Sequence, residues 1–292
     1  MEKKSVTLLI ILGAIWGSSF MFMKLLAPVF GPILTASLRL LIGAAVLAIY
    51  FRVKGVKLSL LKNIKMYLIL GPISLGIPYF LFSVAALNVP SGVSAILNTT
   101  APMFTAILTF FILNEKMKVY NVFGLMIATG GVAMVMSNTI TGFNSGAVLG
   151  VLCVLAASML YAISGVIIKT KTTHIDSNSL AFGNQLIGGL SLLPFVILYP
   201  VTGIINLKVV LTLLTFGVFG SGVAMVIYFY LMKQVGPVKT LTVTYLFPIF
   251  GLFFGYVFLH EKLSSGFFFG GALILIGIIL VNLKGLKVFS KV

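Results

Sequence analysis

Residues 89–116 of the chain read VPSGVSAILNTTAPMFTAILTFFILNEK, and residues 235–262 read VGPVKTLTVTYLFPIFGLFFGYVFLHEK. A shift of 146 positions aligns the two stretches and places Pro102 on Pro248. In each copy an apolar helix starts at a proline or glycine, carries a second proline near its middle and ends in Glu-Lys. The chain therefore contains one apolar unit twice.

The composition around these stretches is that of a membrane protein. Of the 292 residues, 60% are hydrophobic and only 8% are charged, and the mean hydropathy is +1.20. A soluble domain could not bury this much apolar surface, so the solvent must be lipid. A spanning helix needs about 20 apolar residues, and ten segments qualify. We therefore predict an all-α polytopic protein with ten transmembrane helices, at residues 5–27, 32–51, 66–87, 91–113, 119–137, 145–168, 178–199, 207–232, 237–259 and 265–284.

The basic residues predict the orientation, because lysine and arginine are enriched in cytoplasmic loops. With the amino terminus inside, the outside loops carry only Lys208 and Lys262, and nearly all the other basic residues lie inside. We therefore expect a multi-pass protein of the cell membrane with both termini cytoplasmic. The first segment reads as an anchor and not as a cleavable signal peptide. The net charge of +16 is then mainly a topogenic signal and requires no nucleic-acid partner.

The duplication extends beyond the opening stretches. The shift of 146 relates the third to fifth segments to the eighth to tenth, and a shift of 145 places Lys24 on Lys169. We therefore expect two five-helix repeats, residues 1–140 and 145–292. Because five is odd, the second repeat would enter the membrane from the opposite side. Inverted repeats of this kind build transporters whose substrate site lies near the midplane, where the halves meet.

These features resemble the EamA type of the drug/metabolite transporter superfamily. The resemblance covers the whole chain and rests on the repeats, on GAIWGSSF at residues 13–20 followed by Lys24, and on the Asn-Glu-Lys and His-Glu-Lys helix ends. It implies a secondary transporter of small metabolites, often an exporter of amino acids or other solutes. It also implies a cavity between the halves.

The paired prolines mark the predicted midplane. A proline has no backbone N–H, and its ring clashes with the carbonyl four residues earlier. That carbonyl belongs to Asn98 for Pro102 and to Thr244 for Pro248. Pro102 follows Ser91 by a rise of roughly 16 Å, about half of the hydrocarbon core. We therefore expect a kink at each proline and a freed backbone acceptor in each repeat.

Polar and aromatic side chains at similar depth complete the candidate site. The small and polar residues on these helices indicate either a cavity wall or close helix packing, and Asn98 favours the cavity wall. For Trp16, packing and ligand contact are both open. The candidate substrate-binding residues are Trp16, Ser19, Arg39, Tyr79, Asn98, Thr99, Tyr161, Ser164, Asn184, Gln185, Tyr228, Thr244 and Tyr245.

The charged residues within and near the spans bear on which class of transporter the chain could be. Within the spans, Lys24 could snorkel to the interface, whereas Arg39 could hold a substrate carboxylate or phosphate or dock on backbone carbonyls. No acidic residue is expected at mid-membrane, which disfavours a cation antiporter with a buried carboxylate. For Glu115 and Glu261 at the helix ends, salt bridges with nearby lysines are favoured over a gating role.

Several other classes of function are disfavoured. The chain has one cysteine, Cys153, and no Cys/His cluster, so we expect no disulfide, metal or cofactor. An intramembrane enzyme would need a nucleophile with a base, or a set of metal ligands; both histidines lie at helix ends and no acidic residue is expected at mid-membrane, so we do not expect an enzyme. The expected partners are a small-molecule substrate and the lipid bilayer. The main prediction is alternating-access transport of amino-acid-like or organic-anion solutes. The alternative is a flippase for an anionic lipid carrier, with Arg39 as the headgroup clamp.

Overall fold

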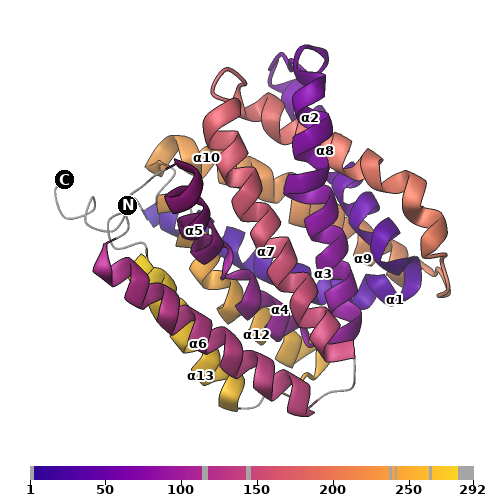
Figure 1. Ribbon diagram of the computed structural model, residues 1–292. Coiled ribbons are helices and arrows are strands. Elements are labelled where there is room, and N and C mark those ends of the chain that lie inside the picture. Colours follow the sequence, from indigo (N-terminus) through magenta and orange to yellow (C-terminus); the bar gives the residue numbers. More distant parts are fainter. Residues whose placement is uncertain are drawn as a thin grey trace.

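The computed structural model describes residues 3–113, 118–142, 146–236, 239–240, 242–262 and 265–281, with the backbone alone for residues 136–142. In these ranges the regular elements are helices, and no strand is present. Figure 1 shows them as one bundle of crossing helices. The prediction of an all-α polytopic membrane protein is confirmed.

The amino-terminal helix is a hairpin of two arms. Helix α1 (Lys3–Val53) is interrupted at Gly31, which has φ 75° and ψ 158° and is flanked by Pro28 and Pro32. This backbone region is essentially restricted to glycine. A Cβ atom at Gly31 would also lie 2.8 Å from the Tyr199 carbonyl oxygen. The first two predicted spans therefore meet at a turn that needs both the freedom and the small size of glycine.

Replacing Gly31 with alanine should destabilise the protein by about 1–3 kcal/mol from backbone strain, and more from the clash with Tyr199. The matched control is Gly55→Ala, since Gly55 has a similar φ of 65° and open space around it. Thermal unfolding of the purified variants in detergent measures both effects. Equal losses at the two positions would show that the contact at Gly31 is unimportant.

The other helices follow the predicted segments closely. The rest of the first half contains η1 (Leu61–Asn63), α2 (Ile64–Gly71), η2 (Pro72–Gly76), α3 (Ile77–Asn88), α4 (Ser91–Asn98), α5 (Ala101–Leu113) and α6 (Val119–Gly142). The second half contains α7 (Gly146–Lys171), α8 (Ser177–Leu192), η3 (Leu193–Leu198), α9 (Leu207–Gly217), η4 (Val218–Val223), α10 (Ala224–Val235), η5 (Thr242–Leu246), α12 (Phe247–Leu259) and α13 (Ser265–Val281). Elements η2 and η4 are π-helical.

Seven helical stretches among the described residues are long and apolar enough to cross a membrane, and one of them is the two-armed α1. Two shorter apolar stretches, residues Val119–Val135 of α6 and the whole of α13, coincide with the fifth and tenth predicted spans. Length and composition do not place a helix across a bilayer. The number of ten crossings and the inversion of the second repeat therefore stay predictions.

The prolines of the duplicated stretches interrupt the chain differently from the kinks that we expected. Helix α4 ends at Asn98, and α5 starts with Pro102 as its second residue. In the second copy, the 3₁₀ helix η5 precedes α12, which has Pro248 as its second residue. Proline is well suited to the first turn of a helix, where its missing amide would have no partner. Each proline therefore begins a new helix.

The two halves of the chain are interleaved. Helix α1 packs against α8, α9 and α12, helix α4 packs against α12, and α6 lies alongside α13 (Figure 1). Glycines bring the last pair into backbone contact, since a Cβ atom at Gly131 would lie 2.6 Å from the Gly270 carbonyl oxygen. Close approach through small residues is a common way to pack helices in lipid. Equivalent segments of the two expected repeats thus lie against one another.

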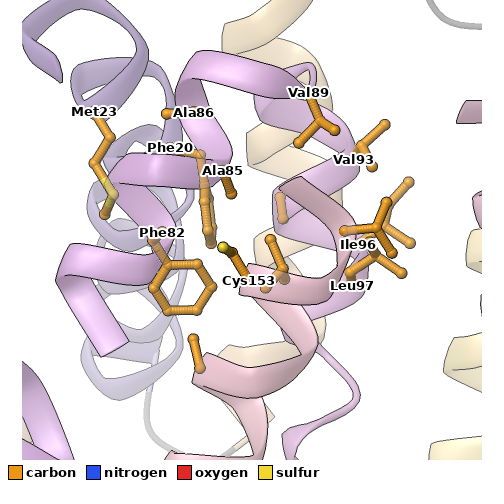
Figure 2. Close-up of a cluster of buried hydrophobic side chains, with 14 of the residues drawn as sticks. Phe20, Met23, Phe82, Ala85, Ala86, Val89, Val93, Ile96, Leu97 and Cys153 are labelled. Carbon is orange, nitrogen blue, oxygen red and sulfur yellow. The ribbon is translucent and has the colours of Figure 1, made fainter. Parts of the chain in front are cut away.

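The largest hydrophobic cluster joins both halves. Figure 2 shows Phe20, Phe82 and Cys153 converging in this cluster, with Ile96 and Leu97 of α4 nearby. The rings of Phe20 and Phe82 meet edge to face with centroids 5.6 Å apart. Cys153 is a buried free thiol. The cluster fixes α1, α3, α4 and α7 around the polar side chains described next.

Candidate functional site: an arginine between the two halves

Arg39 lies on the second arm of α1 and is only 2% exposed. Its Nε donates a hydrogen bond to the Ser221 hydroxyl at 2.9 Å, and its Nη2 donates to the Ser19 hydroxyl at 3.4 Å and to the Gly220 carbonyl at 3.3 Å. Ser19 comes from the first arm of α1, whereas Gly220 and Ser221 belong to η4 in the second half. The guanidinium group therefore joins the two halves of the chain.

Two aromatic rings enclose this guanidinium group. Its central carbon lies 3.9 Å from the centroid of the Tyr79 ring and 4.4 Å from that of Phe216. Tyr79 is on α3 in the first half, and Phe216 is on α9 in the second. Such contacts stabilise a cation in a site that excludes water. Because the rings stack on the faces of the guanidinium group, they do not occupy its hydrogen-bonding edges.

The charge of Arg39 is incompletely satisfied. None of its partners in the described part of the chain is acidic, and Nη1 has no hydrogen-bond partner. The Gln185 Nε2 is a second buried donor without a hydrogen-bond partner. Gln185 and Ser221 both lie next to Gly43, so this amide is near one of the partners of Arg39. Burying unpaired donors and an uncompensated charge is costly. A carboxylate or phosphate that accepted from the Arg39 Nη1 would remove part of that cost.

The π-helical segment η4 presents Ser221 and Gly220 to Arg39. It lies close against the second arm of α1, because a Cβ atom at Gly222 would come within 2.6 Å of Val46. Single π-helical turns are rare and often occur at functional sites. Under the shift of 146 positions, η2 in the first half aligns with η4. The two halves therefore contain a π-helical turn at corresponding positions.

The structure brings five of the predicted site residues into this region, namely Ser19, Arg39, Tyr79, Tyr161 and Gln185. The side chain of Tyr161 interacts with Tyr79 and lies within reach of the Arg39 charge. Sequence reasoning did not select Phe216, Gly220 or Ser221. A signal for Gly220 and Ser221 was present, because the glycine-rich sequence 217–222 aligns with the glycine-containing sequence 71–76 under the shift of 146 positions.

Two further candidates, Trp16 and Tyr228, form a separate cluster. Their ring centroids are 5.5 Å apart, and Trp16 also meets Phe247 edge to face at 5.9 Å. The two side chains pack around buried apolar residues that include Leu12 and Leu231. This arrangement fits a packing role, which the sequence analysis left open for Trp16.

Most of the remaining candidates lie at helix ends or form hydrogen bonds within their own helix. Asn98 and Thr99 are buried at the end of α4, where the Thr99 hydroxyl donates to the Ile96 carbonyl and the Asn98 Oδ1 has no partner. The Ser164 hydroxyl donates to the carbonyl of Tyr161 in its own helix. Three more complete the set: Asn184 is buried on α8, and Thr244 and Tyr245 lie in η5.

At the helix end that carries Glu261, the carboxylate forms hydrogen bonds to α4, whereas we favoured a salt bridge with a nearby lysine. The Glu261 carboxylate binds the backbone amide of Ser91 on α4, and the Lys24 Nζ donates to the Val89 carbonyl at 3.0 Å. Glu115 lies outside the described residues. Among the described residues, Arg39 is therefore a charged side chain buried between the halves, whereas Lys24 and Glu261 face each other at one end of the bundle.

The fold and the site together define a multi-pass helical membrane protein with a buried cationic group between its halves. The chain belongs to the EamA-like transporter family, of the drug/metabolite transporter superfamily, because that family matches residues 3–137 and again residues 148–283. Each match covers most of one half of the chain. The protein is thus a membrane transporter by family.

Individual relatives agree with this assignment. The chain is 30% identical to the uncharacterized transporter YoaV of Bacillus subtilis, over 90% of this chain and 91% of YoaV. It is 25% identical to the uncharacterized inner membrane transporter YedA of Escherichia coli, over 92% of this chain and 87% of YedA. A protein of known crystal structure superposes with a TM-score of 0.69 over 99% of both chains, at 18% identity, and shows the fold alone.

Proposed function

We propose that this protein is a secondary transporter that exports small amino-acid-like or organic-anion solutes across the cell membrane by alternating access. Its termini would lie in the cytoplasm, as the distribution of basic residues predicts. The solute would bind between the halves, with its anionic group on Arg39. The main support is that Arg39 is buried between the halves with Nη1 unpartnered and no acidic neighbour among the described residues.

Alternating access needs an interface that can open at either end. Arg39 has hydrogen-bond partners in both halves, so relative movement of the halves would change its contacts. A solute carboxylate would complete the hydrogen bonding of the guanidinium group and could favour one arrangement over the other. Export, as the family resemblance implies, sets the proposed direction of net movement.

The proposal is tested by counterflow in proteoliposomes loaded with unlabelled solute and supplied with trace amounts of the labelled solute. The panel should contain amino acids, mono- and dicarboxylates and their neutral amides. Saturable counterflow of an anionic or zwitterionic solute is the expected result. Flux limited to fluorescent anionic lipids would instead favour a flippase. The absence of flux for every member of the panel, with folded protein, would contradict the proposal.

Asn98 offers a test of whether α4 lines the transport pathway. Asn98→Ala should lower counterflow several-fold and change stability little, because its Oδ1 forms no hydrogen bond that the substitution would break. An unpartnered buried acceptor costs roughly 1–3 kcal/mol, so the variant could even gain stability. Thr105→Ala is the control, since the Thr105 hydroxyl bonds only to Ala101 in its own helix. Normal flux in both variants would indicate that Asn98 does not line the pathway.

A further inference from the structure

A carboxylate from the second half holds the start of a helix in the first half. The Glu261 Oε1 accepts a hydrogen bond from the Ser91 amide at 2.7 Å, and its Oε2 accepts from the Ser91 hydroxyl at 2.8 Å and from the Gly92 amide at 3.4 Å. Ser91 and Glu261 lie 170 positions apart in the chain. The contact joins the end of α12 to the beginning of α4.

Helix α4 depends on Glu261 for its capping. Its N-cap residue is Pro90, which makes no side-chain capping bond. The first amides of a helix have no partner within the helix and carry partial positive charge, so a carboxylate is well placed there. On the same end of the bundle, the Lys24 Nζ bonds to the Val89 carbonyl at 3.0 Å and faces the Glu261 charge. Glu261 thus lies between a helix amino terminus and a lysine.

The turn after α12 directs Glu261 into this position. His260 has φ 51° and ψ 34°, a left-handed conformation that is uncommon for a residue other than glycine. The Glu261 amide then donates to the Gly255 carbonyl at 3.1 Å, which reverses the chain. A Cβ atom at Gly255 would lie 2.5 Å from the Glu261 Oε2 and 2.7 Å from the Ser91 Oγ. The glycine therefore leaves the space that the carboxylate occupies.

We propose that Glu261, Ser91, Gly92 and Lys24 form a clasp that closes this end of the interface between the halves, and that the clasp opens when solute exchanges on that side. The proposal rests on the alternating access proposed above. It differs from the Arg39 site, because Glu261 and Ser91 belong to helix ends and would hold the halves together without touching solute. The predicted topology places the clasp on the outer side of the membrane.

A single introduced thiol can report on the clasp. Ser94 is one turn beyond Ser91 on α4, is 2% exposed and has no hydrogen-bond partner for its hydroxyl. The chain has one native cysteine, so Ser94→Cys in a Cys153→Ala background provides the only thiol. The rate of its reaction with a membrane-impermeant maleimide would be measured in proteoliposomes. Slow labelling is expected while Glu261 is intact.

Glu261→Gln removes the charge and keeps the shape of the side chain. It should accelerate labelling of the Ser94→Cys thiol at least about tenfold, equivalent to 1.4 kcal/mol in the opening equilibrium. Gly255→Ala should have a similar effect with Glu261 retained, because the added methyl would displace the carboxylate. Lys262→Gln is the control, since Lys262 is exposed beside Glu261 and should not alter the rate.

Glu261→Gln and Gly255→Ala test the clasp independently, so the experiment can still be interpreted if one of the two variants fails to fold. Faster labelling in either folded variant, with an unchanged rate for Lys262→Gln, would support the clasp. Unchanged labelling in the folded variants would overturn it, and equal acceleration by Lys262→Gln would show a general charge effect. The labelling measurement needs no substrate. Unchanged labelling would therefore overturn the clasp and leave the transport proposal intact. Absent counterflow, together with faster labelling in the clasp variants, would contradict the transport proposal alone.

Discussion

Arg39→Gln should reduce transport of an anionic solute by about tenfold to 100-fold. A hydrogen bond between charged groups contributes about 1.5–3 kcal/mol, and each 1.4 kcal/mol is a factor of about ten. Glutamine retains a donor but loses the charge and the second edge of the guanidinium group. The loss should appear in counterflow with the solute that the wild-type protein transports best.

The same substitution should not unfold the protein. A buried charge without an acidic partner carries an uncompensated desolvation cost, and a neutral side chain at the same position removes that cost. The hydroxyl of Ser19, one partner of Arg39, can also bond to the Ile15 carbonyl. Arg52→Gln, at the exposed end of α1, is the control for loss of one positive charge. Full transport by Arg39→Gln, or equal losses in the control, would count against an anion site at Arg39.

The second large effect is expected at Gly251, where the two duplicated stretches touch. A Cβ atom at Gly251 would overlap the Cβ atom of Ala95, so that α12 and α4 pack with no space for another methyl group. Gly251→Ala should therefore force the helices apart. Overpacking of this kind typically costs about 1–3 kcal/mol. The apparent melting temperature of the purified protein should fall by several degrees.

A compensating change makes this prediction specific to the contact between the halves. Ala95→Gly removes the methyl group that Gly251→Ala would meet. The double variant Ala95→Gly/Gly251→Ala should recover most of the lost stability, because the methyl group is only moved from α4 to α12. Additive losses in the double variant would show that the two positions do not touch.

Much of the fold follows from the sequence because lipid imposes a simple rule on helix length. The predicted span at residues 91–113 coincides with the ends of α4 and α5, and the predicted link before Pro32 contains the Gly31 turn. The break after Asn98 was less predictable. It depends on how the start of α5 packs in the bundle, and a proline permits either a kink or a new helix.

The candidate site was predictable only in part. Arg39 stands out in the sequence because charges within spans are rare. Its partner Ser221 does not stand out, because a π-helical turn brings it to the guanidinium group and single residues do not signal such a turn. Trp16 and Tyr228 were predicted at a depth similar to that of Arg39, but their rings pack with one another in a separate cluster. Depth can be predicted from position in a span, whereas lateral neighbours depend on helix packing.

The most direct test of the proposed anion site compares a transported acid with its neutral amide in the wild-type protein and in Arg39→Gln. If the solute carboxylate binds the Arg39 guanidinium group, the wild-type protein should transport the acid at least about tenfold faster than the amide, a preference of 1.4 kcal/mol or more. In Arg39→Gln the two rates should become nearly equal. An unchanged acid-to-amide ratio in the folded variant would contradict the binding of the solute's anionic group at Arg39.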